Sequence, residues 1–60
     1  MEKKDLIEFV GEKVKIILKN NYYYKCSILS VGDDYVKIRD FHDNIVFVVL
    51  DEIKLLEVKE

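Results

Sequence analysis

Two groups of side chains in this sequence suit contact with a nucleic acid. Basic residues recur at alternate positions, as in Lys13 and Lys15 and again in Lys37 and Arg39. Three tyrosines stand together at residues 22–24, directly before a lysine. Cations neutralise phosphates and aromatic rings stack on unpaired bases. The basic positions indicate a surface for single-stranded RNA if the fold brings them onto one face, whereas the tyrosine run is the weaker candidate because aromatic residues also favour strands.

A third group is acidic and lies in turn-like segments. The side chains that could offer ligands to a divalent cation are Asp40, His42 and Asp43, with Asp33 and Asp34 nearby. A metal site needs a full ligand set on a rigid frame, and one His with one Cys in the whole chain does not supply it. No nucleophile–base pair or phosphate-binding loop is visible. We therefore predict no metal, no cofactor and no catalysis.

The composition restricts the chain to one small domain, residues 1–60, with ten Lys and Arg against twelve Asp and Glu. Such a chain buries only about 60% of its unfolded surface. Cys26 is the only cysteine, so no internal disulfide can form and oligomerisation is the remaining source of stability. The longest uncharged apolar run, residues 45–50, is too short to span a membrane. A lone thiol and no visible export segment favour a cytoplasmic setting.

Hydrophobic periodicity predicts a mostly β fold with one short N-terminal helix. Leu6, Phe9 and Val10 share one face of a helix over residues 3–10, and Gly11 can end it in a left-handed conformation. From there the period changes to two, which indicates half-buried strands. The predicted strands cover residues 13–19, 22–31, 35–40, 45–50 and 53–58.

The same alternation assigns most basic residues to the outward face of the first three strands. The members of this outward set are Lys13, Lys15, Lys19, Lys25, Lys37 and Arg39, and Tyr23 shares their parity. Cys26 has the opposite parity and is expected to be an inert core residue. Lysines are also ordinary solvent-facing strand residues that discourage aggregation, so this second interpretation stays open.

The fourth predicted strand, residues 45–50, is apolar on both faces. Strands of this kind are normally covered on both sides, and so short a chain has little material to cover both. We therefore predict a homo-oligomer, although the N-terminal helix is an alternative cover. The expected interface residues are Phe47, Val48, Val49, Leu55 and Leu56.

Three segments carry a family resemblance. Residues 14–21 resemble the opening of the first Sm motif, with Asn21 where the family usually has Gly. Residues 24–29 resemble the strand that follows, and residues 33–38 the Asp-x-aromatic segment after it, with one extra residue near Gly32. The order of one helix and five strands is also that of the Sm-like (LSm/Hfq-like) family. The resemblance implies a strongly bent five-stranded antiparallel sheet, an SH3-type small barrel, assembled into a ring through its fourth and fifth strands.

The resemblance also implies an RNA site in the loop between the second and third strands. By position, Tyr35 is the residue that stacks on a base, Lys37 is its polar partner and Asp33 positions the loop. The outward basic residues that complete the expected RNA-binding set are Lys15, Lys25 and Arg39. A second family loop normally carries a cation, and the matching residues 49–51 here are Val, Leu and Asp.

Two functions follow from these patterns and stay open. The first is a ring-forming, non-enzymatic subunit whose partners are other copies of the chain and single-stranded RNA. The second is an oligomeric structural or protein-interaction module without a nucleic-acid role. The basic outward face and Tyr35 favour the first function, whereas the net charge of −2 and the missing loop cation favour the second.

Overall fold

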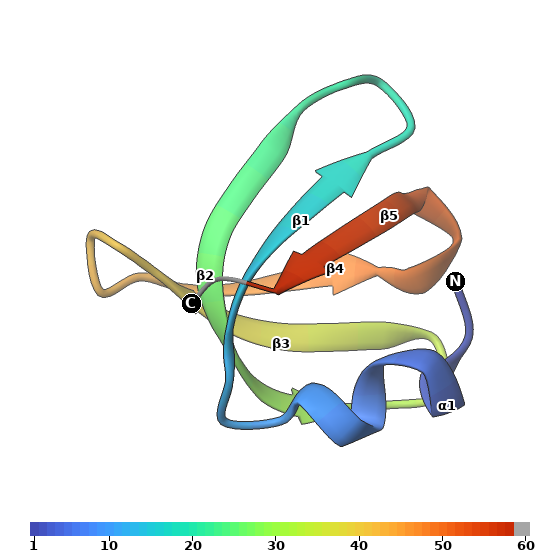
Figure 1. The fold of residues 1–60 in the computed structure, drawn as a ribbon, viewed down its shortest axis with the longest axis horizontal. Helices are drawn as coiled ribbons and strands as arrows, with labels where there is room; N and C mark the ends of the chain where they lie inside the picture. Colours follow the sequence, from blue (N-terminus) through green and yellow to red (C-terminus); the bar gives the residue numbers. More distant parts are fainter. Residues whose placement is uncertain (59–60) are drawn as a thin grey trace.

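The fold is a five-stranded antiparallel sheet with a short helix at its lower end (Figure 1). It comes from a computed structural model that describes residues 1–58. The elements in chain order are helix α1 (Lys3–Leu6), the 3₁₀ turn η1 (Ile7–Phe9), β1 (Lys13–Leu18), β2 (Tyr23–Val31), β3 (Tyr35–Asp40), β4 (Ile45–Val49), the 3₁₀ turn η2 (Leu50–Glu52) and β5 (Ile53–Val58). The predicted fold class, mostly β with one N-terminal helix, is confirmed.

The strands pair in the order β4-β3-β2-β1-β5, so β4 and β5 are the two edges. No pairing joins these edges within residues 1–58, and the sheet is therefore open. The five-stranded antiparallel sheet that the resemblance implies is therefore present, without closure into a barrel. Each edge presents unpaired backbone groups, which another strand can pair with.

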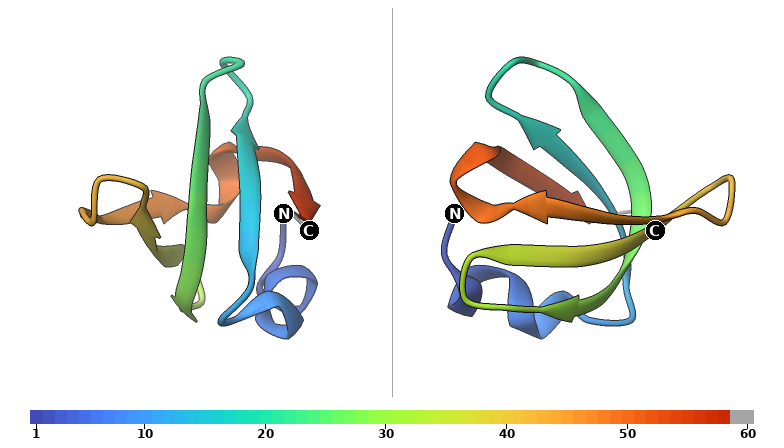
Figure 2. Two further views of the ribbon diagram at one scale, coloured as in Figure 1. Left: turned by 60° about the vertical axis from the view of Figure 1, so that its left-hand side comes forward. Right: turned by 180° about the vertical axis from the view of Figure 1, so that it is seen from behind.

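Two register shifts bend the sheet. One lies in β2, where Leu29 is the extra residue between Ile28 and Ser30, and the other lies in β5, where Lys54 is extra opposite Ile17 and Leu18 of β1. An extra residue in one strand increases its local bend and twist. The curvature of the long β2 is visible in the right-hand view of Figure 2.

The core lies inside this curved sheet. Its ten buried apolar residues are Leu6, Val14, Ile16, Cys26, Ile28, Val36, Ile38, Val48, Leu50 and Ile53. The inward residues of β1, β2 and β3 follow the predicted alternation. Leu6 is completely buried in the core and attaches α1 to the sheet.

The helical segment is shorter than predicted. The backbone changes from α to 3₁₀ at Ile7, so Leu6 and Phe9 still align at a spacing of three. Val10 instead takes an extended conformation, bridges to Ile28 and is 43% exposed, so its predicted place on the helix face is wrong. Gly11 has a φ of +87°, as expected for the residue that ends a helix.

Within the described residues 1–58, no helix has the length and apolar character required to cross a membrane.

Candidate nucleic-acid interface

The outer face of the sheet carries two lysines directly opposite each other. Lys15 of β1 pairs in register with Lys25 of β2, and on its other side Lys15 faces Glu57 of β5. The Lys15 ammonium lies 4.5 Å from the centre of the Tyr23 ring. We call Lys15 and Lys25 the lysine pair.

The lysine pair is not neutralised by ion pairs in the described part of the chain. The ion pairs found within residues 1–58 are Lys3–Asp33, Lys4–Glu2 and Arg39–Asp43. Like charges directly opposite each other on neighbouring strands are destabilising. The Tyr23 ring and the facing Glu57 offset part of this cost at Lys15, and an anion bound between the two ammonium groups would offset more of it.

Two other predicted cations of this face, Arg39 and Lys37, have neighbours that make them less available to a ligand. Arg39 of β3 lies opposite Ser27 of β2, but its guanidinium is 3.4 Å from the Asp43 carboxylate. Lys37 is half-buried and lies opposite Phe47 of β4. Arg39 is therefore partly neutralised, and Lys37 belongs to an apolar neighbourhood. Unlike Arg39, the lysine pair forms no ion pair within residues 1–58, and the exposed Lys13 and Lys19 form none there either.

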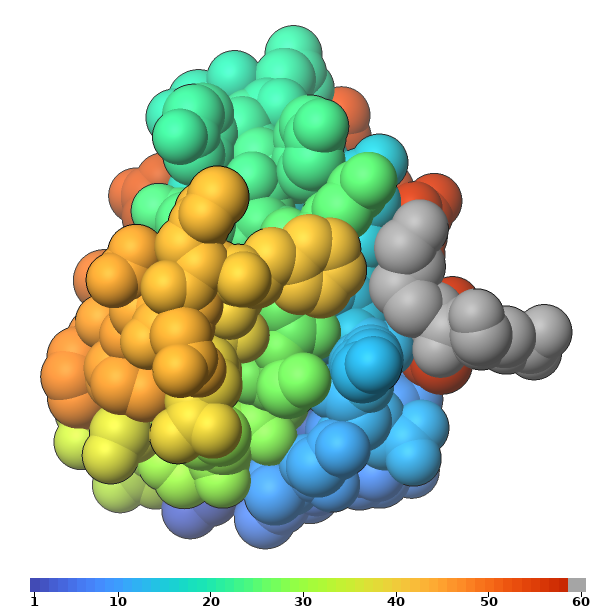
Figure 3. All heavy atoms as spheres, turned by 90° about the vertical axis from the view of Figure 1, so that its left-hand side faces the viewer, coloured from blue at the N-terminus to red at the C-terminus, as the bar shows by residue number. Residues whose placement is uncertain are grey.

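A hollow of about 280 Å³ lies next to the lysine pair, between the start of β2 and the turn that follows β3. Its lining residues are Tyr22, Tyr23, Tyr24, Lys25, Asp40, Phe41 and His42, and we call it the aromatic hollow. Figure 3 shows the side chains of the β3–β4 turn beside those of β2 on this side of the molecule. Lys25 belongs both to the lysine pair and to the hollow, so the two features form one continuous site.

The rings of the hollow are well exposed. Phe41 is 68% exposed, and Tyr22 and Tyr23 are exposed as well. Tyr22 meets Tyr24 edge to face, with ring centres 5.6 Å apart. The β1–β2 turn holds Tyr22 in place, because the Asn20 side-chain oxygen accepts the Tyr22 N–H at 2.9 Å. Rings exposed to this extent contribute little to the core and are available to a ligand.

Asp40 fixes the turn that carries Phe41. One of its carboxylate oxygens accepts the N–H groups of His42 and Asn44, each at 2.9 Å. The bond from the Asn44 N–H is the main cause that lowers the pKa of Asp40, and the bond from His42 adds to it, against an opposing effect of partial desolvation. Asp43 completes the turn with a φ of +68°. Asp40, His42 and Asp43 thus have structural roles in a turn.

Cys26 lies in the core behind this face. Burial, with a smaller contribution from the nearby Asp40 carboxylate, raises the pKa of Cys26 to about 11. The thiol therefore stays protonated and unreactive at neutral pH. Within residues 1–58, no three His, Cys, Asp or Glu side chains gather closely enough to hold a metal ion.

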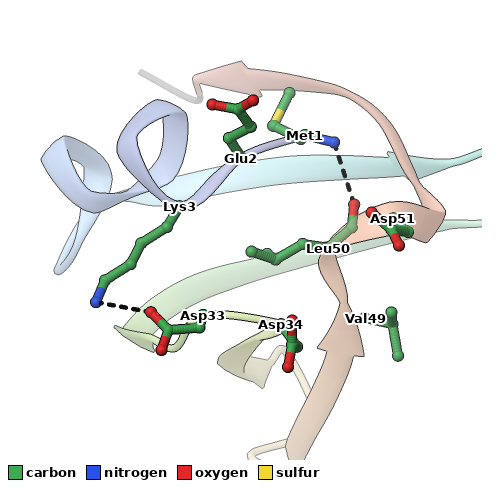
Figure 4. A pocket seen from close by; sticks show the side chains of 8 residues that line it. All are labelled: Met1, Glu2, Lys3, Asp33, Asp34, Val49, Leu50 and Asp51. Atoms are coloured by element: carbon green, nitrogen blue, oxygen red, sulfur yellow. Dashed lines mark hydrogen bonds and ion pairs between the residues drawn. The ribbon is translucent and has the colours of Figure 1, made fainter.

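The loop to which the family resemblance assigned RNA binding has a different character. Asp33, Asp34 and Asp51 line a pocket of about 390 Å³ together with the N-terminal segment. Figure 4 shows Lys3 reaching Asp33, at 3.5 Å, and the N-terminal ammonium reaching the Leu50 carbonyl oxygen, at 3.2 Å. The structure thus brings the two expected loops together, but the pocket between them is rich in carboxylates and repels phosphate.

Tyr35 lies at the edge of this region with its ring already in contact with the protein. A side chain added at Gly32 would come within 3.2 Å of the Tyr35 ring, so the ring rests against this glycine. Its centre is also 5.4 Å from that of Phe47, in an edge-to-face arrangement. The structure therefore separates Tyr35, Lys37 and Asp33 from the lysine pair, rather than joining all the predicted RNA-binding residues in one site.

The outer face of β4 is a second exposed surface. Phe47 is 60% exposed, and Ile45 and Val49 on the same face are also exposed. We call these three side chains the β4 strip. Val48 is only 5% exposed and belongs to the core, so its side chain is not available to an interface. On the opposite edge of the sheet, Leu55 is partly exposed, whereas Leu56 packs against the core.

Sequence reasoning did not assign a role to Phe41. It treated residues 41–44 as a simple turn and the tyrosine run as a weak signal. A phenylalanine between turn-forming Asp and Asn residues was the available clue, because an apolar ring rarely gains from a position in a solvated turn. Only the structure shows that this turn folds towards the start of β2.

No protein-family model and no curated protein matches this chain. Among solved structures, it is similar to a chain from "Structural basis of the Dcp1:Dcp2 mRNA decapping complex activation by Edc3 and Scd6". The TM-score is 0.69 at 19% sequence identity, over 92% of this chain and 59% of that one. This likeness extends to the fold. The present chain spans only about 59% of that neighbour's length.

Proposed function

We propose that this protein is a non-enzymatic, Sm-like module that binds single-stranded RNA on the outer face of its sheet. The observation that supports this most directly is the lysine pair, two ammonium groups opposite each other on β1 and β2 with no ion-pair partner in residues 1–58. An RNA phosphate between them would relieve their mutual repulsion. The adjacent rings add a means of stacking unpaired bases.

The proposal moves the RNA away from the loop that the family resemblance implies. The pocket at that loop contains the carboxylates of Asp33, Asp34 and Asp51. A negatively charged strand is attracted to the lysine pair and repelled from this pocket, although the chain as a whole is slightly acidic. The neighbouring structure belongs to an mRNA decapping complex by its description, which is in keeping with an RNA-associated role.

The second part of the proposal is self-assembly, supported by the β4 strip and by the two free sheet edges. Phe47 and its neighbours expose an apolar face on the β4 edge strand, and Leu55 offers a smaller apolar contact on β5. Pairing β4 of one copy with β5 of the next would cover both edges and generate a ring or an open chain. Sedimentation equilibrium measures the native mass, and a single 7.2 kDa species at micromolar concentration contradicts this part.

RNA titration of a charge-reversed variant tests the first part. Lys15→Glu combined with Lys25→Glu removes both ammonium groups and introduces repulsion. We expect the affinity for a short single-stranded RNA to fall about 10- to 100-fold. The slope of log affinity against log salt should become shallower by about 1.4, since each phosphate contact contributes roughly 0.7.

The matched control is Lys4→Glu combined with Lys54→Glu, which changes the net charge equally at two exposed positions away from the lysine pair. The control should reduce binding much less than the test variant. Equal losses in both variants mean that only the overall charge matters, and a wild type that binds no RNA at low salt refutes RNA binding.

A further inference from the structure

We infer that the aromatic hollow is the binding site of an unpaired nucleobase, with Phe41 as its principal stacking ring. This inference rests on the proposed RNA-binding function and gives it a specific site. It differs from the site implied by the family resemblance, in which Tyr35 supplies the ring. The residues that carry the inference are Phe41, Tyr22 and Lys25.

The exposure of the rings is the first argument. Phe41 is the most exposed of the large apolar side chains described in residues 1–58, and Tyr22 is the next. Two such rings in neighbouring turns line one hollow and remain in contact with water, so a ligand that entered the hollow would bury apolar surface of both. A flat aromatic ligand suits them, because stacked and edge-to-face arrangements are favourable for rings.

The rigidity of the turn is the second argument. Asp40 accepts two backbone N–H groups of the turn at 2.9 Å, so Phe41 is held between two anchored residues. Tyr22 is similarly fixed through its own N–H and through the edge contact with Tyr24. A site whose backbone is already fixed in this way loses less conformational entropy when a ligand binds.

Charge is the third argument, and it selects the class of ligand. Lys25 lines the hollow and Lys15 lies across from it on β1, while the one carboxylate in the lining, that of Asp40, already accepts two backbone N–H groups of its own turn. These cations disfavour a cationic side chain of a protein partner. They favour a ligand that combines an aromatic ring with an adjacent negative charge, which is the chemistry of a nucleotide. A volume of about 280 Å³ is small for a ligand pocket and suits a single base with its sugar.

The bases of a duplex are already stacked and paired, so the site requires a single strand. Phosphates next to the seated base then lie over the lysine pair. The stacking component of binding depends on the base, whereas the lysine component depends only on the phosphate backbone. This separation makes the inference testable independently of the proposed function.

The test compares a short oligoadenylate with an abasic strand of the same length, which keeps the phosphates but lacks the bases. The wild type should bind the intact strand about tenfold more tightly, the scale of one base–aromatic stack. Phe41→Ala should remove most of this preference and leave the affinity for the abasic strand unchanged. Because Phe41 is largely exposed, the variant should fold normally, and thermal melting checks this.

Phe47→Ala is the matched control, since Phe47 is an exposed phenylalanine on the other side of β3. It should retain the wild-type preference for the intact strand. A second measurement is ultraviolet crosslinking with mass spectrometry, which should place the crosslink in residues 40–44 or 22–24 rather than at Tyr35.

Each alternative result has a clear meaning. Equal binding of the intact and abasic strands overturns the inference of a nucleobase site, but RNA binding by the lysine pair remains supported. A preference that survives Phe41→Ala, or crosslinks confined to Tyr35, places the base elsewhere and also overturns the inference. Absence of binding to either strand refutes the proposed function and the inference together.

Discussion

Phe41 and Phe47 have nearly the same exposure, at 68% and 60%, yet their surroundings differ. Phe47 stands in an edge strand between other apolar side chains, with unpaired backbone groups beside it. Phe41 stands in an anchored turn, next to tyrosines and a lysine. Exposure alone therefore does not assign a role to an aromatic residue. A free backbone edge suits another polypeptide, whereas a hollow with cations suits a nucleotide.

The most severe test of this contrast places the same charge in both regions. Phe47→Lys should dissociate the assembly, because an unpaired charge buried in an interface costs about 3–5 kcal/mol. Phe41→Lys should leave the native mass unchanged, since the aromatic hollow lies outside the proposed interface. Sedimentation equilibrium of both variants at the same concentration provides the comparison.

The subunits of both variants should remain folded, which far-ultraviolet circular dichroism checks. If Phe41→Lys also dissociates the assembly, the hollow belongs to the interface and the contrast between the two regions fails. An unchanged mass for Phe47→Lys would mean that the β4 strip is not the contact.

The sequence was most informative where side chains alternate. The inward positions of β1, β2 and β3, such as Val14, Ile28 and Ile38, could be predicted because a strand buries every second residue. The two-faced character of β4 was also visible. The sequence could not show that Val48 turns inwards, because apolar residues on both sides of a strand give no parity signal.

The candidate site was less predictable, because it depends on how the sheet bends. Residues 22–25 and 40–42 lie far apart in the sequence and meet only after β2 curves and the β3–β4 turn folds back. The helix switch at Ile7 was similarly hidden, since α and 3₁₀ segments this short have the same composition. Alternation predicts which face a residue occupies, but not which distant residue it meets.

A smaller effect is expected at Tyr35, an aromatic residue that contacts Phe47 of the β4 strip and to which the family resemblance assigns base stacking. Its ring contacts Gly32 and Phe47, so Tyr35→Ala should lower the free energy of unfolding by about 1 kcal/mol, the scale of an aromatic pair. The affinity for single-stranded RNA should stay within about twofold of the wild type, because Tyr35 lies outside the proposed site. Loss of a ring that stacks on a base would instead cost about 1–3 kcal/mol of binding free energy. Chemical denaturation and RNA titration of the same variant give both quantities.

Tyr35→Phe is the control for Tyr35, because it keeps the ring and should restore the stability. If Tyr35→Ala instead reduces RNA affinity strongly while stability is unchanged, the stacking role implied by the family resemblance is correct and the aromatic hollow is not the principal site.

The smallest expected effect concerns the anchor of the aromatic hollow and depends on pH. The pKa of Asp40 is lower in the folded protein than in the unfolded chain, mainly because its carboxylate accepts the Asn44 N–H. Its contribution to stability is therefore present above the unfolded pKa and is lost as the pH falls through the folded pKa. Asp40→Asn keeps a hydrogen-bond acceptor but cannot titrate, so melting temperatures of this variant should fall less steeply than those of the wild type as the pH is lowered below about 4. Because the hydrogen bonds of this anchor lie within the turn of Phe41, the variant should leave the native mass unchanged. A change in assembly, or identical pH profiles for the two proteins, would show that Asp40 does not anchor the turn in the way the hydrogen bonds indicate.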